Sequence, residues 1–456
     1  MARLPTVIAL ASLLAGPAMA VPPPTAFVNV TVVPMDADRL IRGQTVVVHD
    51  GHIVEMGAVD EIGVPEDART IDGEGRYLMP GLAEMHAHIP PQTGHEQYTL
   101  DTLFLYVANG ITFARGMLGA PHHLELREQA ERGEIISPRI YTSGPSLNGD
   151  SVASPASAHQ MVVAQWAAGY DFLKIHPGLD RSRYDAIVAA AREHGIDWAG
   201  HVSHEVGLLH ALETGQATVD HLDGYIAPLL RDGSPKSDMT PSFFGWNLAD
   251  EVDEEKIVPL ARTTQEAGTW NVPTESLLQH VLLPSPAAEE LAARDEMRFV
   301  SPELRAQWVE RKNNLLSDPD YDPELARRFI AVRGRLIKAL HDEGAGLLLG
   351  SDAPQVFNVP GFSIHHELRM LVEAGLTPYE ALATGTVNVA TFLGDEDVFG
   401  TIAVGQRADL VLLEANPLAD VGNVREPAGV MLSGRWLPAA KLRAGLQEIA
   451  ARHRQE

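Results

Sequence analysis

The sequence contains no cysteine, and this absence removes several kinds of chemistry at once. Disulfide scaffolds, thiolate zinc sites and cysteine nucleophiles are all excluded. Any metal ion must therefore be held by histidine, carboxylate or modified lysine side chains. A chain without cysteine would also suit an oxidising compartment.

Positive charge is scarce. The chain has 35 lysine and arginine residues against 61 aspartate and glutamate residues, which gives a formal net charge of −26. The average surface would repel a phosphate backbone or an anionic bilayer. We expect a small-molecule substrate, with no nucleic acid and no membrane as partner, and the sequence leaves homo-oligomer formation open.

Long apolar runs are also missing after the N-terminus, where no stretch reaches the roughly 18 uninterrupted apolar residues of a membrane span. The N-terminus itself resembles a signal peptide over residues 1–20, because Arg3 precedes the short apolar run 7–14 and the small-x-small motif Ala18-Met19-Ala20. The alternative is a buried first helix, which the prolines at 22–24 disfavour. We expect cleavage after Ala20 and a protein that is exported, either periplasmic or secreted.

The remaining composition is that of a soluble globular protein. Of 456 residues, 45% are apolar, 21% charged and 6% aromatic. Disordered and fibrous chains have a different balance. At about 150 residues per domain, the length allows about three domains, or one large barrel with an appendage.

Short alternating segments at the two ends of the mature chain predict antiparallel strands. We expect residues 21–78 and 399–456 to build one small β-sandwich together, the second part ending in a helix. The predicted strands are Phe27 to Pro34, Gln44 to His49, His52 to Met56, Gly405 to Glu414 and Val430 to Leu437.

Between these ends, apolar strand-like runs alternate with helical patterns, which predicts an α/β fold. Eight such strands would close residues 79–398 into a TIM-like (β/α)8 barrel. The charged segment 282–320 is predicted to be a helical insertion, either a lid or solvated scaffold. The predicted strands are 110–115, 139–143, 172–175, 198–201, 217–221, 269–274 and 346–351, and the helices include 182–193, 254–266 and 323–342.

Metal chemistry is first indicated by His86 and His88, which follow a Pro-Gly turn in PGLAEMHAH. Residues i and i+2 of a strand point to the same face, so both imidazoles would project into the mouth of a barrel. The alternative is a pair of surface histidines, which the partners on later strands make less attractive. The spacing therefore predicts a chelating pair.

Lys174 in DFLKIH is an unusual residue for an apolar strand, because burying an ammonium group is costly. It must be neutralised, paired or modified, unless it simply points to the surface. A neutral lysine amine can react with CO2 to give a carbamate, whose two oxygens can bridge two cations.

Three more candidate ligands stand at the predicted ends of later strands, where such barrels place their active sites. His201 ends WAGH, His221 ends TVDH, and Asp352 follows the apolar run LLLGS. Each alone could be structural. Their order along the chain, after His86, His88 and Lys174, is much harder to attribute to accident.

At these motifs the chain resembles the amidohydrolase superfamily, in particular exported proteins related to prolidase and imidazolonepropionase. The resemblance also covers EAGLTPYEALATGTVNVATFLG and GTIAVGQRADLVLLEANPL, and so nearly all of the mature chain. It implies a TIM-like barrel with a β-sandwich from both termini. It also implies a centre of two divalent metal ions, most often zinc.

By position, the resemblance implies that His86 and His88 hold the more buried ion with Asp352. His201 and His221 would hold the more exposed ion, and carboxylated Lys174 would bridge both. Two such cations would lower the pKa of a shared water, so that hydroxide exists near neutral pH.

Three residues are candidates for catalysis and substrate binding. Asp352 would accept the proton of the hydroxide and deliver it to the departing amine. Tyr225 in HLDGY would donate to the carbonyl oxygen or to a substrate carboxylate, unless it is a packed loop aromatic. Arg115, at the predicted end of the second strand, is another carboxylate-binding candidate. Through Arg115 and Tyr225 we expect a preference for a free carboxylate on the leaving amino acid.

We therefore expect hydrolysis of dipeptides or N-acyl amino acids. Two departures from related enzymes bear on this expectation. The loop 144–150 contains no histidine, where the prolidase-like branch usually has one, and position 204 is histidine where deaminases carry glutamate. The alternatives are hydrolysis of a lactone, another ester or a phosphotriester, deamination, and a binding protein that has lost its metals.

Overall fold

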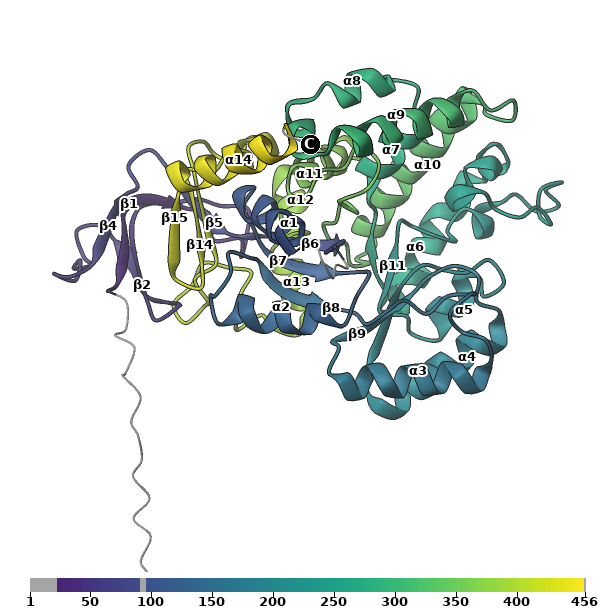
Figure 1. The fold of residues 1–456 in the computed structure, drawn as a ribbon, viewed down its shortest axis with the longest axis horizontal. Helices are drawn as coiled ribbons and strands as arrows, with labels where there is room; N and C mark the ends of the chain where they lie inside the picture. The colour runs from purple at the N-terminus through teal and green to yellow at the C-terminus, as the bar shows by residue number, and fades with distance from the viewer. Residues whose placement is uncertain (1–22, 91–95, 455–456) are drawn as a thin grey trace, which may run out of the picture.

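The computed structural model describes residues 23–90 and 96–454. The signal peptide predicted over residues 1–20 lies outside the described residues. Figure 1 shows an elongated molecule with a sheet from both ends of the chain on one side, strands β6–β8 near the middle, and the later strands and long helices on the other side.

The two ends of the chain meet in one eight-stranded sheet of order β15-β14-β13-β5-β1-β2-β3, with β4 paired to β1. Strand β13 joins the ends by pairing antiparallel to β5. The meeting of the two ends agrees with the prediction, but the described strands form one sheet and the two-layered sandwich is not confirmed. The strands are β1 Thr25–Val32, β2 Ile41–His49, β3 His52–Ala58, β4 Arg69–Asp72, β5 Tyr77–Pro80, β13 Leu410–Leu413, β14 Gly429–Leu432 and β15 Arg435–Pro438, followed by helix α14 Ala439–His453.

The central strands form two parallel sheets. One has the order β6-β7-β8 and the other β12-β11-β10-β9. The strands are β6 Leu82–Ala87, β7 Ile111–Gly116, β8 Arg139–Thr142, β9 Phe172–Ile175, β10 Asp197–Gly200, β11 Thr218–Asp220 and β12 Trp270–Val272. They lie where the sequence predicts strands, so the α/β class is confirmed.

In the described part of the chain, isolated bridges and hydrogen bonds join the edges of the two parallel sheets, among them a bridge from Leu147 to Ile175. Single parallel bridges join Ser143 to Phe172 and Asn271 to Leu347. The Met85 N–H then donates to the Leu349 carbonyl over 2.8 Å. Among the described residues no closed barrel is assigned, because residues 346–351 make a bridge where the sequence predicts a full strand.

Helices alternate with these strands and carry recognisable start and stop signals. Asp322 caps α10 by accepting from the backbone N–H groups of Glu324 and Leu325, and α4 runs from the cap Asp180 to Gly195 in the left-handed conformation. The helices are α1 Glu96–Ala108, α2 His122–Glu131, α3 Pro155–Ala168, α4 Arg181–His194, α5 Leu208–Glu213, α6 Ile257–Glu266, α7 Glu275–Leu282, α8 Ala288–Ala292, α9 Pro302–Leu316, α10 Pro323–Asp342, α11 Phe362–Glu373, α12 Pro378–Ala383 and α13 Val387–Leu393.

Helices α4, α6 and α10 confirm the predictions at 182–193, 254–266 and 323–342, although residues 254–256 form a separate 3-10 turn. A search of the described helices finds none with the length and apolar character to cross a bilayer.

The segment 282–320 is helical, as predicted, and contains α8 and α9. It is attached to the fold by Lys312, which is fully buried and donates to the carbonyls of His280 and Pro286 over 2.7 and 2.8 Å. Its role as a lid stays a prediction.

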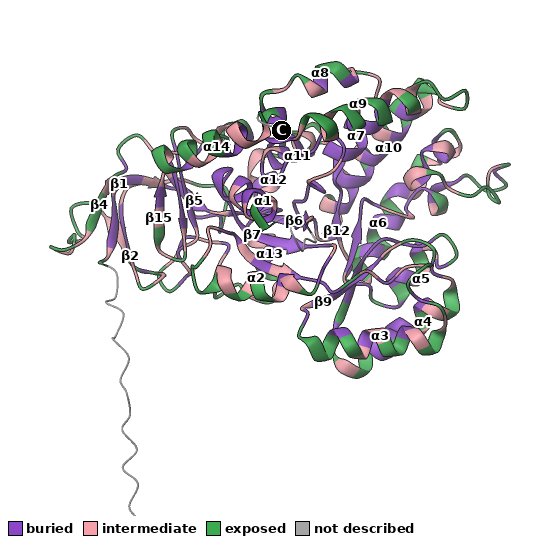
Figure 2. Ribbon diagram, viewed as in Figure 1, coloured by how far each residue is buried: buried purple, intermediate pink, exposed green. Residues whose placement is uncertain are grey.

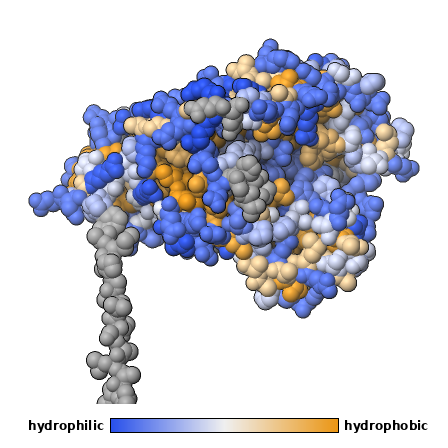
Figure 3. Space-filling view, viewed as in Figure 1, coloured by the Kyte–Doolittle hydropathy of each residue, from blue (hydrophilic) through white to orange (hydrophobic). Residues whose placement is uncertain are grey.

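Burial is concentrated in the central strands. Every residue of β6, β7 and β9 is buried, and Figure 2 shows these strands purple beneath helices with exposed outer faces. Strands covered on both faces are typical of parallel sheets with helical crossovers. The space-filling view shows hydrophilic residues over most of one face, with apolar residues in smaller separate groups, one of them on the lower lobe (Figure 3).

Candidate metal centre

The first two candidate ligands come from β6 and the residue just beyond it. His86 and His88 point to the same side of the strand, with ring centroids 5.5 Å apart. His86 is 1% exposed. Burial holds the pKa of His86 well below its ordinary value, so the ring stays neutral, which is the form that binds metals.

Asp352 faces both histidines from the end of the segment 346–351. Its Oδ1 lies 2.8 Å from His88 Nε2 and 3.6 Å from His86 Nε2. Asp352 has a φ of +62°, in the left-handed region that non-glycine residues rarely adopt. Such strain is typical of functional sites, where the surrounding structure holds a side chain in place.

His221 brings the third strand end into the cluster. Its Nδ1 lies 2.8 Å from Thr274 Oγ1 and 3.8 Å from Asp352 Oδ2. Its ring centroid is 4.4 Å from that of His86, and burial holds the pKa of His221 well below its ordinary value. His86, His221 and Asp352 can offer ligand atoms that all lie within 4.8 Å of one another.

Lys174 is buried next to this group, on β9. Its side chain is fully buried, and its Nζ has no hydrogen-bond partner but lies 3.7 Å from Asp220 Oδ2. Burial lowers the pKa of Lys174 to about 8, against the attraction of Asp220 and Asp352. Gly200 makes room for this side chain, since a Cβ there would lie 2.9 Å from Lys174 Cδ.

His201 lies at the open side of the cluster. Its ring centroid is 4.6 Å from that of His221, and its Nδ1 is 3.1 Å from Asp223 Oδ2. The second nitrogen of a metal-binding histidine usually contacts a carboxylate in this way, which fixes the orientation of the ring. Asp223 therefore positions His201.

Glu84 supports the other side of the cluster, on the same face of β6 as His86. Its Oε1 accepts from the backbone N–H groups of His86 and Ser351 over 3.0 and 2.8 Å, and its Oε2 accepts from the Ser351 hydroxyl over 2.6 Å. Glu84 thus ties β6 to the residue before Asp352. Burial raises the pKa of Glu84 to about 8, against these hydrogen bonds.

Asp220, which the sequence motifs did not single out, lies at the centre of the charged interior. Asp220 is fully buried, and its Oδ2 lies 3.0 Å from His86 Nδ1. Burial alone would raise the pKa of Asp220, but the charges of Arg115 and Lys174 outweigh it and lower the pKa. A carboxylate directly before a ligand histidine was the available signal, because ligand histidines need such partners.

The structure corrects the substrate-binding role predicted for Arg115. The side chain is 1% exposed. Its Nε donates to the Met85 carbonyl over 2.7 Å, and its Nη2 lies 3.2 Å from both Thr218 Oγ1 and Asp220 Oδ1. The guanidinium is directed into the interior between the sheets, where it neutralises Asp220, so it offers no face to a substrate carboxylate.

The structure also corrects the substrate-contacting role predicted for Tyr225. It is fully buried, and its hydroxyl bonds Thr264 Oγ1 over 3.0 Å and donates to Asn271 Oδ1 over 2.8 Å. Burial raises the pKa of Tyr225. The ring packs between α6 and β12, so its hydroxyl is used by the core and is not available to a substrate.

The cluster passes a chemical test for a metal centre. Its donors are neutral imidazoles and a carboxylate, a set that suits zinc and similar divalent ions. One of its buried polar atoms, Lys174 Nζ, has no hydrogen-bond partner, and Asp352 Oδ1 faces His88 Nε2 and His86 Nε2 at 2.8 and 3.6 Å. Buried polar atoms are rarely left without a partner, so a modified lysine beside a bound cation would satisfy this group.

Comparison with known proteins places the chain in a family. A model of the amidohydrolase family matches residues 77–437, most of the sequence. The chain belongs to this family. It is therefore a hydrolase of the metal-dependent amidohydrolases, which act on carbon–nitrogen bonds and typically use a binuclear centre.

Individual relatives are distant but cover almost the whole chain. The imidazolonepropionase of Pseudomonas putida is 26% identical over 406 residues, which are 84% of this chain and 90% of that one. The solved structure of a bottromycin amidohydrolase has a TM-score of 0.73 at 23% identity, covering 95% of this chain and 91% of that one. A Xaa-Pro dipeptidase structure has a TM-score of 0.64 at 19% identity and covers 91% and 100%. The two structures establish the likeness of fold.

Proposed function

We propose that this amidohydrolase cleaves amide bonds of dipeptides or N-acyl amino acids, using two divalent ions, zinc being the simplest choice. The observation that carries the proposal is the buried convergence of His86, His221 and Asp352 within 4.8 Å, beside Lys174 with its unpartnered amine. The likeness to a Xaa-Pro dipeptidase supports a peptidase-like reaction. We also propose that β6–β12 and residues 346–351 act together as the predicted barrel.

The ligands divide into two groups. His86, His88 and Asp352 would hold one ion, and His201 and His221 the second. Lys174 would bridge both as a carbamate, formed when its neutral amine attacks CO2, a new nitrogen–carbon bond forms and the amine releases a proton. A pKa of about 8 supports this step, because an appreciable fraction of the amine is then neutral at mildly alkaline pH.

Divalent ions, when bound, supply Lewis acidity that lowers the pKa of water and polarises a carbonyl. The chain itself supplies the proton carrier. Asp352 is 5% exposed and lies among the proposed ligands, with its Oδ1 2.8 Å from His88 Nε2, so its carboxylate would accept a proton from the attacking water and pass it to the departing amine. Asp223 holds His201 in place. Glu84 holds the backbone of His86 and Ser351 by accepting from their N–H groups.

A substrate panel tests this function. The full chain, loaded with zinc, is given free and amidated dipeptides, N-acyl amino acids and lactones. We expect amide hydrolysis that a chelator abolishes and zinc restores. Cleavage of lactones alone, or activity that survives complete chelation, would contradict the proposal.

Export remains part of the proposal. It is supported by the charged, apolar and small-residue pattern of residues 1–20 and by the absence of cysteine. Expression of the full sequence in a bacterial host, followed by fractionation and N-terminal sequencing, is expected to give a chain that begins at Val21.

A further inference from the structure

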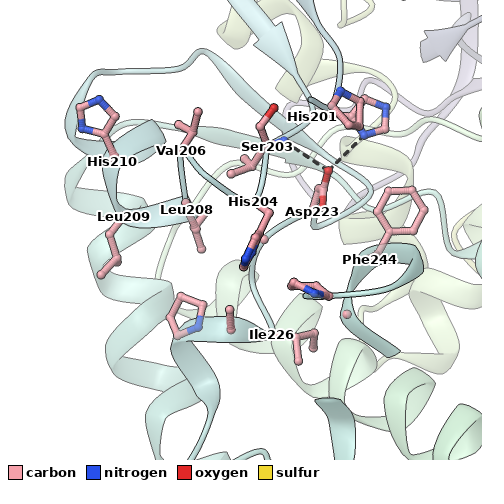
Figure 4. A pocket seen from close by; sticks show the side chains of 18 of the residues that line it. His201, Ser203, His204, Val206, Leu208, Leu209, His210, Asp223, Ile226 and Phe244 are labelled. Atoms are coloured by element: carbon pink, nitrogen blue, oxygen red, sulfur yellow. Dashed lines mark hydrogen bonds and ion pairs between the residues drawn. The ribbon is translucent and has the colours of Figure 1, made fainter. Parts of the chain in front are cut away.

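A cavity of about 620 Å³ opens beside the metal cluster. It is lined by the loops that follow β9, β10 and β11, and includes Val206, Leu208, Leu209, Ile226, Phe243 and Phe244. In Figure 4, Leu209 and Phe244 lie on opposite sides of it. A volume of several hundred Å³ with a largely apolar wall is typical of pockets for small organic ligands.

The cavity is continuous with the candidate metal centre. His201 and Asp223 line its wall. The Phe244 ring centroid lies 6.0 Å from that of His201 and 5.0 Å from that of His221. A substrate with its amide at these histidines would therefore extend its adjoining group into the cavity.

The aromatic wall is held in a fixed position. Phe243, Phe244 and Gly245 have φ values of +33°, +64° and +88°, three successive residues in the left-handed region. A Cβ on Gly245 would lie 3.0 Å from Ile226 Cβ, so a larger residue there would be crowded as well as strained. Non-glycine residues adopt this conformation only when surrounding contacts hold them, which is common at binding sites.

Charged groups on the wall are largely engaged. Arg181 Nε lies 3.6 Å from Asp185 Oδ2, and His210 Nε2 lies 2.6 Å from Asp185 Oδ1. Asp223 is occupied by His201. His204, the other basic residue of the wall, is exposed to water. Arg181 and His204 are thus exposed to water, and apolar side chains make up the larger part of the wall.

We propose that this cavity binds a bulky, uncharged apolar group, aromatic or branched aliphatic, that adjoins the scissile amide of the substrate. The inference rests on the proposed function, since it places the amide at the metal cluster. The enzyme would then select its substrate by a bulky apolar group, whereas the sequence predicts selection by a free carboxylate.

The test compares matched substrates with the zinc-loaded full chain. N-acetylalanine is the small reference, and N-acetylphenylalanine and N-phenylacetylalanine each add an aromatic ring on one side of the amide. We expect kcat/KM to be at least about tenfold higher for one of the ring-bearing substrates, since hydrophobic pockets discriminate by roughly 10- to 200-fold per added group. Hydrolysis of all three at similar rates would overturn the pocket proposal while leaving the hydrolase intact.

Leu209→Asp tests the wall directly. Leu209 is 56% exposed, so a charge there should be tolerated by the fold, and Val404, 59% exposed and outside the cavity lining, supplies the control Val404→Asp. Leu209→Asp is expected to remove most of the preference for the ring-bearing substrate and Val404→Asp to leave it unchanged. An unchanged preference in Leu209→Asp would contradict the proposal.

A binding measurement separates this inference from the proposed reaction. Benzylacetone and acetone are uncharged ketones with no amide to cleave, and their binding to the zinc-loaded protein can be followed by calorimetry. We expect benzylacetone to bind more tightly by at least about tenfold, with the difference lost in Leu209→Asp. Equal affinities would overturn the pocket even if amides are cleaved, whereas a clear difference would support it even if no amide in the panel is cleaved.

Discussion

Among residues 23–90 and 96–454, two groups of side chains could hold a metal ion, and they differ in burial and in access to water. His86, His221 and Asp352 are all buried, whereas His159, Glu193 and His194 lie at the surface of α3 and α4. In the surface group, the His159 and Glu193 side chains are 51% and 65% exposed.

The two groups differ in the partners that their polar atoms have when no cation is bound. Water can hydrogen-bond to the exposed side chains of the surface group. In the buried group the Asp352 carboxylate faces His86, His88 and His221 away from bulk water, and burial keeps His86 and His221 neutral and ready to bind. Ligand spacing alone therefore does not distinguish these two groups, whereas their burial does.

Replacing Asp352 should have the largest effect. Asp352→Asn keeps the shape of the side chain but removes the proton acceptor, so we expect kcat to fall by roughly 10²–10⁴. Metal content must be measured on the same samples, because Asp352 is also a proposed ligand. Near-normal kcat at full metal occupancy would reject the role.

Lys174→Ala should lose the second ion and lower activity by about 100-fold or more, because the bridge between the ions is removed. A short carboxylic acid in the buffer should partly restore both, by filling the space of the carbamate. Lys312→Ala is the matched control, since Lys312 is the other fully buried lysine among the described residues. If the carboxylic acid raised the metal content and activity of both Lys174→Ala and Lys312→Ala, the bridging role proposed for Lys174 would be contradicted.

Asp223→Asn should have an intermediate effect. Loss of a carboxylate that orients a ligand histidine typically weakens metal affinity by about 10- to 100-fold. Asp185→Asn is the control, because Asp185 holds His210 over 2.6 Å in a similar pair away from the cluster. Competition with a chelator of known affinity measures both variants, and equal affinities would show that Asp223 does not position His201.

The smallest expected effect is on the pH dependence of stability, and it comes from the buried histidine His123. Burial lowers the pKa of His123 to about 4, so the unfolded chain, with an ordinary histidine pKa near 6.5, takes up the proton first. The free energy of unfolding should therefore fall as the pH falls from about 6.5 to about 4.

His123→Asn should make the decrease in Tm over this range less steep, because it removes one proton-linked group. His159→Asn, at a half-exposed position, is the control for the exchange of histidine for asparagine itself. Thermal unfolding at a series of pH values measures both variants, and parallel curves for His123→Asn and the parent chain would show that His123 is not the linked group.

Much of the site could be predicted because local sequence specifies it. Period-two spacing puts His86, on β6, and His88, just beyond it, on one side of the strand, and the apolar residues on both sides of Lys174 mark the buried strand β9. The helical pattern predicted at 323–342 coincides with α10, which Asp322 caps and Pro323 begins. These signals act within a few residues of the side chain that they position.

The errors concern direction and long-range pairing. Arg115 is at the end of β7 as predicted, but its long side chain turns inward to Asp220, 105 residues away in sequence. Tyr225 follows His221 closely, yet the turn between them directs its hydroxyl to Asn271 on another strand. No local pattern distinguishes a strand-end side chain at the mouth from one in the interior, because the choice depends on partners that only the fold brings near.

The central claim is that buried residues of this chain assemble a centre for two metal ions, and elemental analysis of the purified, fully active protein tests it most directly. We predict about two divalent ions per chain, since His86, His88, Lys174, His201, His221 and Asp352 are too many ligands for one tetrahedral ion. His159→Ala, which breaks the surface group, should leave that number unchanged. One ion or fewer per chain in a fully active preparation, or loss of an ion in His159→Ala, would contradict the account.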